Sequence, residues 1–138
     1  MIFKDEKELF DSVRKHLLPD LETTANNFSF DAFSPESNIF LEFKCRTAHY
    51  DQLMVEQNKW FNMLRDMDKF EAKGFYVCAT PKGVFSFDIR DIHTYNRPKF
   101  MDKRLNKTTM YGGGTVTKKI AYLDISLSRN IEASIIGF

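Results

Sequence analysis

The 138-residue sequence predicts a single α/β domain in which helices flank a central mixed β-sheet. Its composition, with 43% hydrophobic and 28% charged residues, is typical of a globular protein with one hydrophobic core. Segments with helical spacing of apolar residues alternate with short strand-like runs, in the order helix, strands, helix, strands. This order predicts an α/β or α+β fold without internal repeats or low-complexity linkers.

Each predicted element has a local pattern and a boundary signal. The first helix has apolar residues at helical spacing up to Pro19, which ends the pattern. The second helix has the strongest pattern, with Asp51 as its N-cap and Gly74 after its end. Residues 90–119 are expected to be mostly irregular. The predicted elements are helices at 3–18 and 51–72 and strands at 27–33, 38–45, 75–79, 84–89 and 120–127.

Two neighbouring strands carry ionisable residues that a purely structural sheet would not need. Side chains alternate along a strand, so Glu42, Lys44 and Arg46 share one face. The short link between residues 27–33 and 38–45 predicts antiparallel neighbours and brings Asp31 near Glu42. Two adjacent carboxylates repel unless a cation intervenes, and Mg²⁺ commonly binds one or two carboxylates.

Lys44 then has a chemical interpretation, because its ammonium can hold a water molecule or stabilise charge that grows on a phosphate. The alternative is a solvated polar face of a half-exposed sheet, on which Glu and Lys pair across strands.

The two predicted helices each add a polar residue on the core-facing side. Gln57 falls within the apolar stripe that contains Trp60 and Leu64, and burying an unpaired amide costs about 1–3 kcal/mol. Glu6 lies on the inward face of the first helix, beside Leu9. A polar site at the sheet would explain both residues. Alternatively, Gln57 bonds to a loop carbonyl, and Glu6 lies in water at the start of its helix.

The order Asp31, then Glu42-Phe43-Lys44, then a helix with Gln57 resembles the PD-(D/E)xK nuclease superfamily. The segment that starts at Glu42 is similar to the virus-type replication-repair branch, in which a leucine, a glutamine and a tryptophan follow the ExK motif. Their counterparts here are Leu53, Gln57 and Trp60.

The front end is similar to archaeal Holliday-junction resolvases and small phage resolvases, which carry a glutamate on the first helix, here Glu6. The resemblance covers residues 3–89, and Phe30 stands where the superfamily often has proline.

This resemblance implies a restriction-endonuclease-like αβββαβ core and hydrolysis of phosphodiester bonds. It implies that Asp31 and Glu42 bind Mg²⁺ or Mn²⁺, with the carbonyl of Phe43 as a possible third ligand. Lys44 would orient or activate the water, and Gln57 would position the water, the lysine or a phosphate. Glu6 would supply a further carboxylate to this catalytic set.

The charge distribution adds a possible nucleic-acid contact. The net charge is only +1, but acidic residues exceed basic ones in residues 1–89 and the reverse holds in 90–138. A flexible loop with solubilising charge explains this asymmetry equally well. The residues expected to contact nucleic acid are Arg46, Arg97, Lys99, Lys103, Arg104, Lys107, Lys118 and Lys119.

The sequence therefore predicts a Mg²⁺-dependent DNA endonuclease of phage type that acts on branched or repair DNA, or else on specific sites. A homodimer would suit paired cuts, and without a membrane span or signal peptide a cytoplasmic location is expected. The two cysteines are expected to be buried free thiols. The alternative is a catalytically inactive nuclease-like module that binds nucleic acid or a protein.

Overall fold

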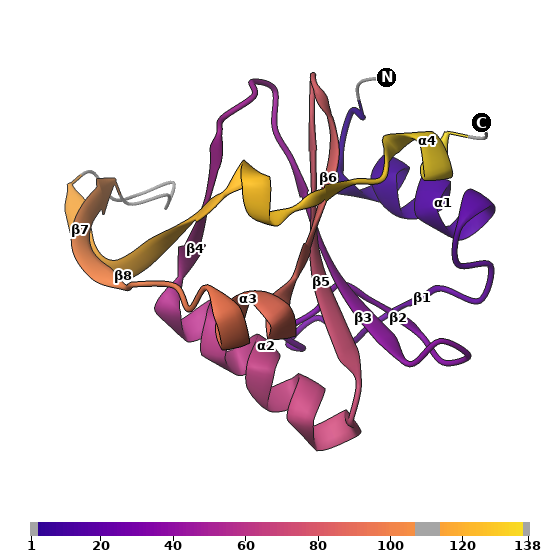
Figure 1. Cartoon of the computed structure of the whole chain (residues 1–138), viewed down its shortest axis with the longest axis horizontal. Helices are drawn as coiled ribbons and strands as arrows, with labels where there is room; N and C mark the ends of the chain where they lie inside the picture. Colours follow the sequence, from indigo (N-terminus) through magenta and orange to yellow (C-terminus); the bar gives the residue numbers. More distant parts are fainter. Residues whose placement is uncertain (1–2, 107–113, 137–138) are drawn as a thin grey trace.

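The computed structural model describes residues 3–106 and 114–136 and has helices on both sides of a mixed sheet (Figure 1). This confirms the predicted fold class. The helices are α1 (Glu6–His16), α2 (Gln57–Phe70), α3 (Ile89–Tyr95), the short α4 (Glu132–Ile135) and the 3₁₀ helix η1 (Ile125–Leu127). The strands are β1 (Glu22–Thr23), β2 (Ala32–Ser34), β3 (Ile39–Cys45), β4 (Gln52–Glu56), β5 (Lys73–Thr80), β6 (Gly83–Asp88), β7 (Met101–Asn106), β8 (Thr115–Asp124) and β9 (Arg129–Asn130).

The main sheet has the strand order β1-β2-β3-β5-β6-β9. Among its described strands only β3 and β5 are parallel, and they are connected through β4 and α2, because parallel neighbours require a long crossover. The other neighbours in this sheet are antiparallel. β4, β8 and β7 form a separate three-stranded antiparallel sheet.

Helix α1 covers one face of the main sheet. Asp5 caps its first turn by accepting a hydrogen bond from the Glu8 N–H at 2.9 Å, and its last turn is basic, as the helix dipole favours. Leu9 and Val13 bury its apolar side against odd-numbered residues of β3, such as Leu41. This hydrophobic layer fixes the orientation of β3, so the even-numbered residues of β3 point to the opposite face.

Helices α2 and α3 and the small sheet cover that opposite face (Figure 1). Trp60, Met63 and Met67 of α2 are buried there against Phe40 of β3. Because both faces of β3 are covered, its ionisable residues do not lie on a half-exposed sheet.

Several boundaries differ from the sequence prediction. Residues 52–56 form β4, so α2 begins at Gln57 and not after Asp51. Leu53 and Val55 alternate with more exposed residues, the strand period that the longer helical pattern concealed. Gly74 lies inside β5, and Glu71 takes the left-handed conformation that ends α2, at φ 50°.

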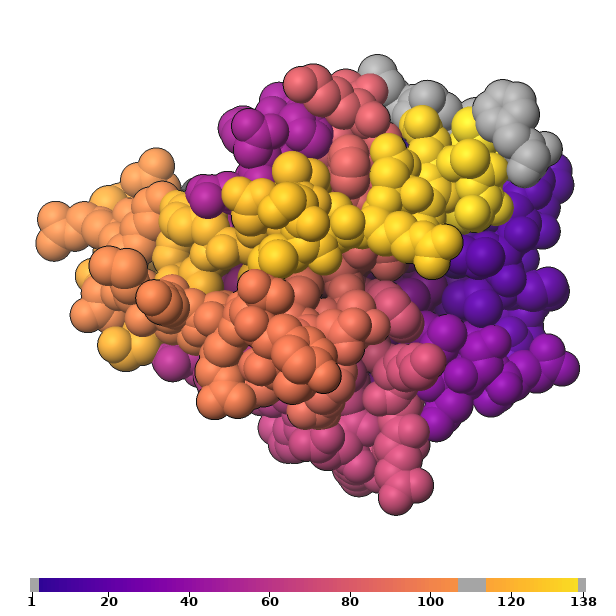
Figure 2. All heavy atoms as spheres, viewed as in Figure 1, coloured from indigo at the N-terminus to yellow at the C-terminus, as the bar shows by residue number. Residues whose placement is uncertain are grey.

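The predicted strand at 27–33 is shorter than expected and covers only residues 32–34. The prediction that residues 90–119 are mostly irregular is wrong, since they contain most of α3, all of β7 and part of β8. The β7–β8 hairpin extends from the body of the molecule, at the left of Figure 1, and forms a projecting edge in Figure 2. Within the described residues, no helix has the length and apolar character that a membrane span requires.

Candidate active site

A pocket of about 710 Å³ lies where β3 passes between the start of α1 and the segment before β2. It brings together most of the catalytic residues predicted from the sequence. We call it the carboxylate pocket. Its lining includes Glu6, Asp31, Glu42, Phe43, Lys44 and Tyr76.

Asp31 is placed by the pairing of two strands. Ala32 of β2 is the partner of Leu41 in β3, and the Asp31 N–H donates to the Leu41 carbonyl at 3.0 Å. One further step of this antiparallel register sets Asp31 opposite Glu42, so the two side chains point to the same face. Asp31 Oδ2 also accepts a hydrogen bond from the Phe43 N–H at 2.9 Å, which holds the carboxylate against β3.

Glu42 is the buried carboxylate of the pocket, with 9% of its surface exposed. One oxygen, Oε2, lies 2.5 Å from the Lys59 Nζ of α2. The other, Oε1, is buried and has no hydrogen-bond partner in the described structure. Burial raises the pKa of Glu42 from 4.5 to about 7, the Lys59 ammonium opposes this shift, and the Asp31 charge adds to it.

Lys59 was not identified from the sequence, yet it is the cation closest to Glu42. Its ammonium also donates to the Ser29 carbonyl at 2.6 Å, in the segment that leads to Asp31. The Ser29 hydroxyl in turn donates to Asp66, a buried carboxylate of α2. These contacts tie α2 to both sides of the pocket. The only indication in the sequence that Lys59 faces the sheet is its spacing, which places Lys59, Met63 and Asp66 on one side of the helix.

Glu6 and Lys44 line the carboxylate pocket together with Asp31 and Glu42. Glu6 Oε1 accepts a hydrogen bond from the Cys45 N–H at 3.3 Å, so the first turn of α1 is anchored to the end of β3. Lys44 is half-buried and follows Glu42 on the same face of β3. Arg14 of α1 adds another cation to the pocket, although the sequence pattern gave it no role.

Gln57 does not line the carboxylate pocket. It is the first residue of α2 and lines a different pocket with Glu56, Lys118 and Lys119. The sequence prediction placed Gln57 within a helix that had already begun at residue 51. Because α2 begins six residues later, Gln57 lies at the N-terminal end of the helix, beside the small sheet.

The basic residues predicted to contact nucleic acid occupy several places. Lys103, Arg104, Lys118 and Lys119 lie exposed on the β7–β8 hairpin, with Lys103 opposite Lys118. Two of them form ion pairs, Lys118 with Glu56 at 2.7 Å and Lys119 with Asp102 at 3.1 Å.

Three further members of this set, Arg46, Arg97 and Lys99, lie apart from the hairpin strands. Arg97 and Lys99 are exposed between α3 and β7, and Arg46 follows β3 in a second pocket. Lys107 lies outside the described residues.

The donor set fits a hard divalent cation bound with few protein ligands. Within residues 3–106 and 114–136, no group of three or more His, Cys, Asp or Glu side chains is arranged to hold a metal ion. Mg²⁺, however, often uses only one or two carboxylates and completes its shell with waters and phosphate oxygens. The observation that favours a cation here is the approach of the Asp31 and Glu42 carboxyl groups, together with Glu42 Oε1, which is buried without a hydrogen-bond partner among the described residues.

Comparison with known proteins shows the fold. The chain matches no protein-family model, and no curated protein matches it significantly in sequence. Among solved structures it is similar to Hjc, a Holliday junction resolvase from the archaeal hyperthermophile Archaeoglobus fulgidus. The two share 15% sequence identity with a TM-score of 0.58, over 91% of this chain and 88% of that one. The chain therefore has the mixed α/β fold of this resolvase.

Proposed function

We propose that the protein is a metal-dependent DNA endonuclease of the PD-(D/E)xK type that acts on branched DNA. The observation that carries this proposal is the pairing of Asp31 with Glu42 in one pocket, beside Lys44. The fold shared with a Holliday junction resolvase and the resemblance of the Asp31, Glu42 and Lys44 pattern to this superfamily both support it.

The side chains of the pocket have separable roles in this proposal. Asp31 and Glu42, with the carbonyl of Phe43, would hold Mg²⁺ or Mn²⁺, which when bound lowers the pKa of water and neutralises phosphate charge. Lys44 orients the attacking water and stabilises the negative charge that develops on the phosphate. Lys59 holds Glu42 in place before the cation binds.

Glu6 and Arg14 extend the pocket along α1. We assign Glu6 a role in orienting the water network at the edge of the pocket, because it is anchored to the end of β3. Arg14 supplies positive charge for a phosphate of the bound strand. The exposed cations of the β7–β8 hairpin are assigned to the flanking DNA backbone, where salt would weaken their contribution.

The second candidate is a catalytically inactive module that binds nucleic acid or a protein. The observation in its favour is the Lys59 ammonium, which occupies Glu42 Oε2 and satisfies part of the site without a metal ion. The two candidates differ in one respect that can be measured, because only the nuclease cleaves DNA when a divalent ion is supplied.

The test is cleavage of end-labelled duplex, nicked, flap and four-way-junction DNA in Mg²⁺, in Mn²⁺ and in EDTA. We expect wild-type protein to cut branched DNA in either metal and not in EDTA. The cleavage rate of Glu42→Gln should be lower by a factor of about 100 or more. Glu22→Gln, an exposed glutamate of β1 outside the pocket, is the matched control and should cut normally. If wild type and Glu42→Gln bind DNA alike and neither cuts, the protein is the inactive module.

A further inference from the structure

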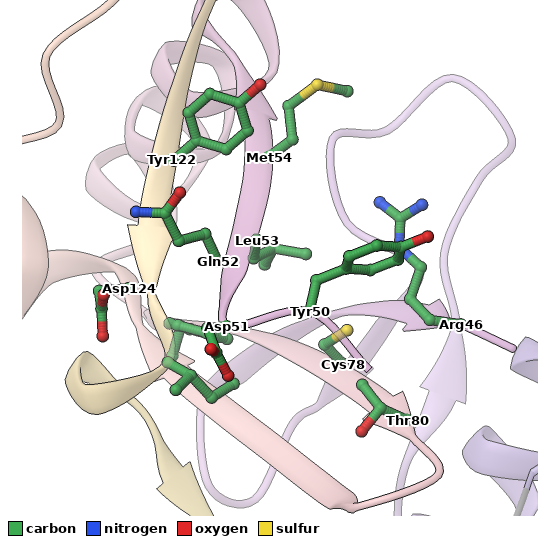
Figure 3. A pocket seen from close by; sticks show the side chains of 12 residues that line it. Arg46, Tyr50, Asp51, Gln52, Leu53, Met54, Cys78, Thr80, Tyr122 and Asp124 are labelled. Atoms are coloured by element: carbon green, nitrogen blue, oxygen red, sulfur yellow. The ribbon is translucent and has the colours of Figure 1, made fainter. Parts of the chain in front are cut away.

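A second pocket of about 520 Å³ lies between β5 of the main sheet and strands β4 and β8 of the small sheet. We call it the tyrosine pocket. Its lining includes Arg46, Tyr50, Asp51, Gln52, Tyr122 and Asp124 (Figure 3). Its size is within the range of small-molecule sites, and nothing in the proposed cleavage chemistry uses it.

The two pockets are consecutive along β3. Glu42 and Lys44 line the carboxylate pocket, and Arg46, two residues further on the same face, lines the tyrosine pocket. The neighbouring strand repeats this order, because Tyr76 lies in the first pocket and Cys78 in the second. Two residues of a strand span about 6–7 Å, so Lys44 and Arg46 are close enough to contact neighbouring nucleotides of one nucleic-acid strand.

The walls of the tyrosine pocket are suited to a flat aromatic group. Tyr50 and Tyr122 are largely exposed for tyrosines, with 63% and 44% of their surface accessible. In Figure 3 they lie on different sides of the pocket, Tyr50 beside Arg46 and Tyr122 beside Met54 of β4. Exposed aromatic rings next to cations are the usual platforms on which unpaired bases stack.

The charged residues of the tyrosine pocket would orient a nucleotide bound there. Arg46 lies on the side next to the carboxylate pocket, and Lys103 donates a hydrogen bond to the Tyr122 hydroxyl, with its ammonium 5.0 Å from the ring centroid. Asp51 and Asp124 lie at the other end, with Gln52 between them and Tyr122 in the view of Figure 3. Carboxylates repel a phosphate but accept hydrogen bonds from base N–H groups, so the base end of a nucleotide faces them.

We infer that the tyrosine pocket binds an unpaired nucleobase of the strand whose backbone crosses the carboxylate pocket. The inference rests on the proposed function for its substrate and extends it. It explains how a small domain would favour DNA with unpaired or separable bases near the cut, because a fully stacked duplex offers no base to this pocket.

The test uses binding in EDTA, so that it does not depend on cleavage. The probe is a forked DNA with 2-aminopurine at an unpaired position, compared with the fully paired duplex. We expect wild-type protein to quench the probe, and Tyr50→Ala and Tyr122→Ala each to weaken binding of the fork by about fivefold or more, with little change for duplex. Tyr50→Phe and Tyr122→Phe keep the rings and should stay within about twofold of wild type.

The matched control is Tyr95→Ala, which removes an exposed tyrosine of α3 that does not line the pocket, and it should bind the fork normally. Alanine variants that bind the fork like wild type, or that lose fork and duplex binding equally, overturn the inference. If these variants lose fork binding while wild type cuts no DNA in any metal, the base pocket stands and the nuclease proposal fails. If wild type cuts branched DNA but the alanine variants bind normally, the nuclease stands and the base pocket fails.

Discussion

The Lys59 ammonium of α2 lies 2.5 Å from Glu42 Oε2, while Glu42 Oε1 is buried without a partner in the described residues. One oxygen of this carboxylate is therefore neutralised by the protein, and the other remains available. In the metal-free protein Lys59 limits the cost of burying a charge. On binding, a divalent ion would take the free oxygen.

Replacing Lys59 by methionine should raise the pKa of Glu42 above its present value of about 7, because the hydrogen bond and the charge of Lys59 both lower it. At pH 8 the free energy of unfolding should fall by about 1–3 kcal/mol, since a buried charge then loses its partner. A ¹³C NMR titration of the Glu42 carboxyl measures the first effect and urea unfolding the second.

Lys82→Met, in the exposed turn between β5 and β6, is the control for the loss of a lysine and should change neither quantity. An unchanged Glu42 pKa in Lys59→Met would show that the two side chains are not paired in solution.

The metal-free protein should lose stability between about pH 4.5 and pH 7. The pKa of Glu42 is raised by folding, so the folded state holds the proton more tightly than the unfolded chain. The stabilising contribution is complete below pH 4.5 and is lost as the pH rises through about 7, with a magnitude on the order of 3 kcal/mol. Urea unfolding in EDTA across this range measures it.

The matched variant for this pH dependence is Glu42→Gln, which cannot titrate. Its stability should lack this decrease, and the difference between the two proteins isolates Glu42 from other titrating groups. A wild-type decrease that persists unchanged in Glu42→Gln would assign the pH effect to another residue.

Lys44 and Gln57 should differ sharply in their effect on cleavage. Lys44→Met removes the lysine that lines the carboxylate pocket with Glu42 and should lower the rate about 100-fold or more. Gln57→Ala should lower it by less than about threefold, because Gln57 lines another pocket. Single-turnover cleavage of a four-way junction compares the two variants, and a large loss in Gln57→Ala would show that the residue reaches the site when DNA is bound.

Gly74→Ala should destabilise the fold by about 1–3 kcal/mol through overpacking. A Cβ at this position would lie 2.6 Å from Met67 Sδ and 2.8 Å from Phe30 Cζ, and both side chains are buried. Since Phe30 directly precedes Asp31, the same change should also disturb the Asp31 loop, which amide chemical shifts would report. If Gly74→Ala were as stable as wild type in urea, the side chains around Phe30 would have rearranged to accept the added methyl group at little cost in stability.

The sequence predicted the residues of β3 well, because strand alternation is a local rule. It placed Glu42 and Lys44 on one face, and the short link after Asp31 placed that carboxylate next to them. The start of α2 was wrong, since Leu53 and Met54 fit both a helical stripe and a strand until their pairing with β8 is known. That pairing joins residues far apart in sequence and leaves no local signal.

Lys59 and the β7–β8 hairpin could not be predicted for the same reason, because their positions depend on contacts between residues far apart in the sequence. A lysine on an amphipathic helix looks like an ordinary surface residue, and only the packing of α2 against Ser29 and Glu42 gives it a partner. Charged residues along β7, such as Lys103 and Arg104, suggested a loop, although the strand is formed by backbone pairing with β8.

The site at which a divalent ion binds can be located by the broadening of amide NMR signals that Mn²⁺ causes. Trace Mn²⁺ should broaden the signals of Asp31, Glu42 and Phe43 first, and Mg²⁺ should compete with this effect. The broadening should disappear in the Asp31→Asn, Glu42→Gln double variant. Broadening that is centred on other carboxylates, such as Asp51 and Asp124, or that is unchanged in the double variant, would show that Asp31 and Glu42 do not bind the ion.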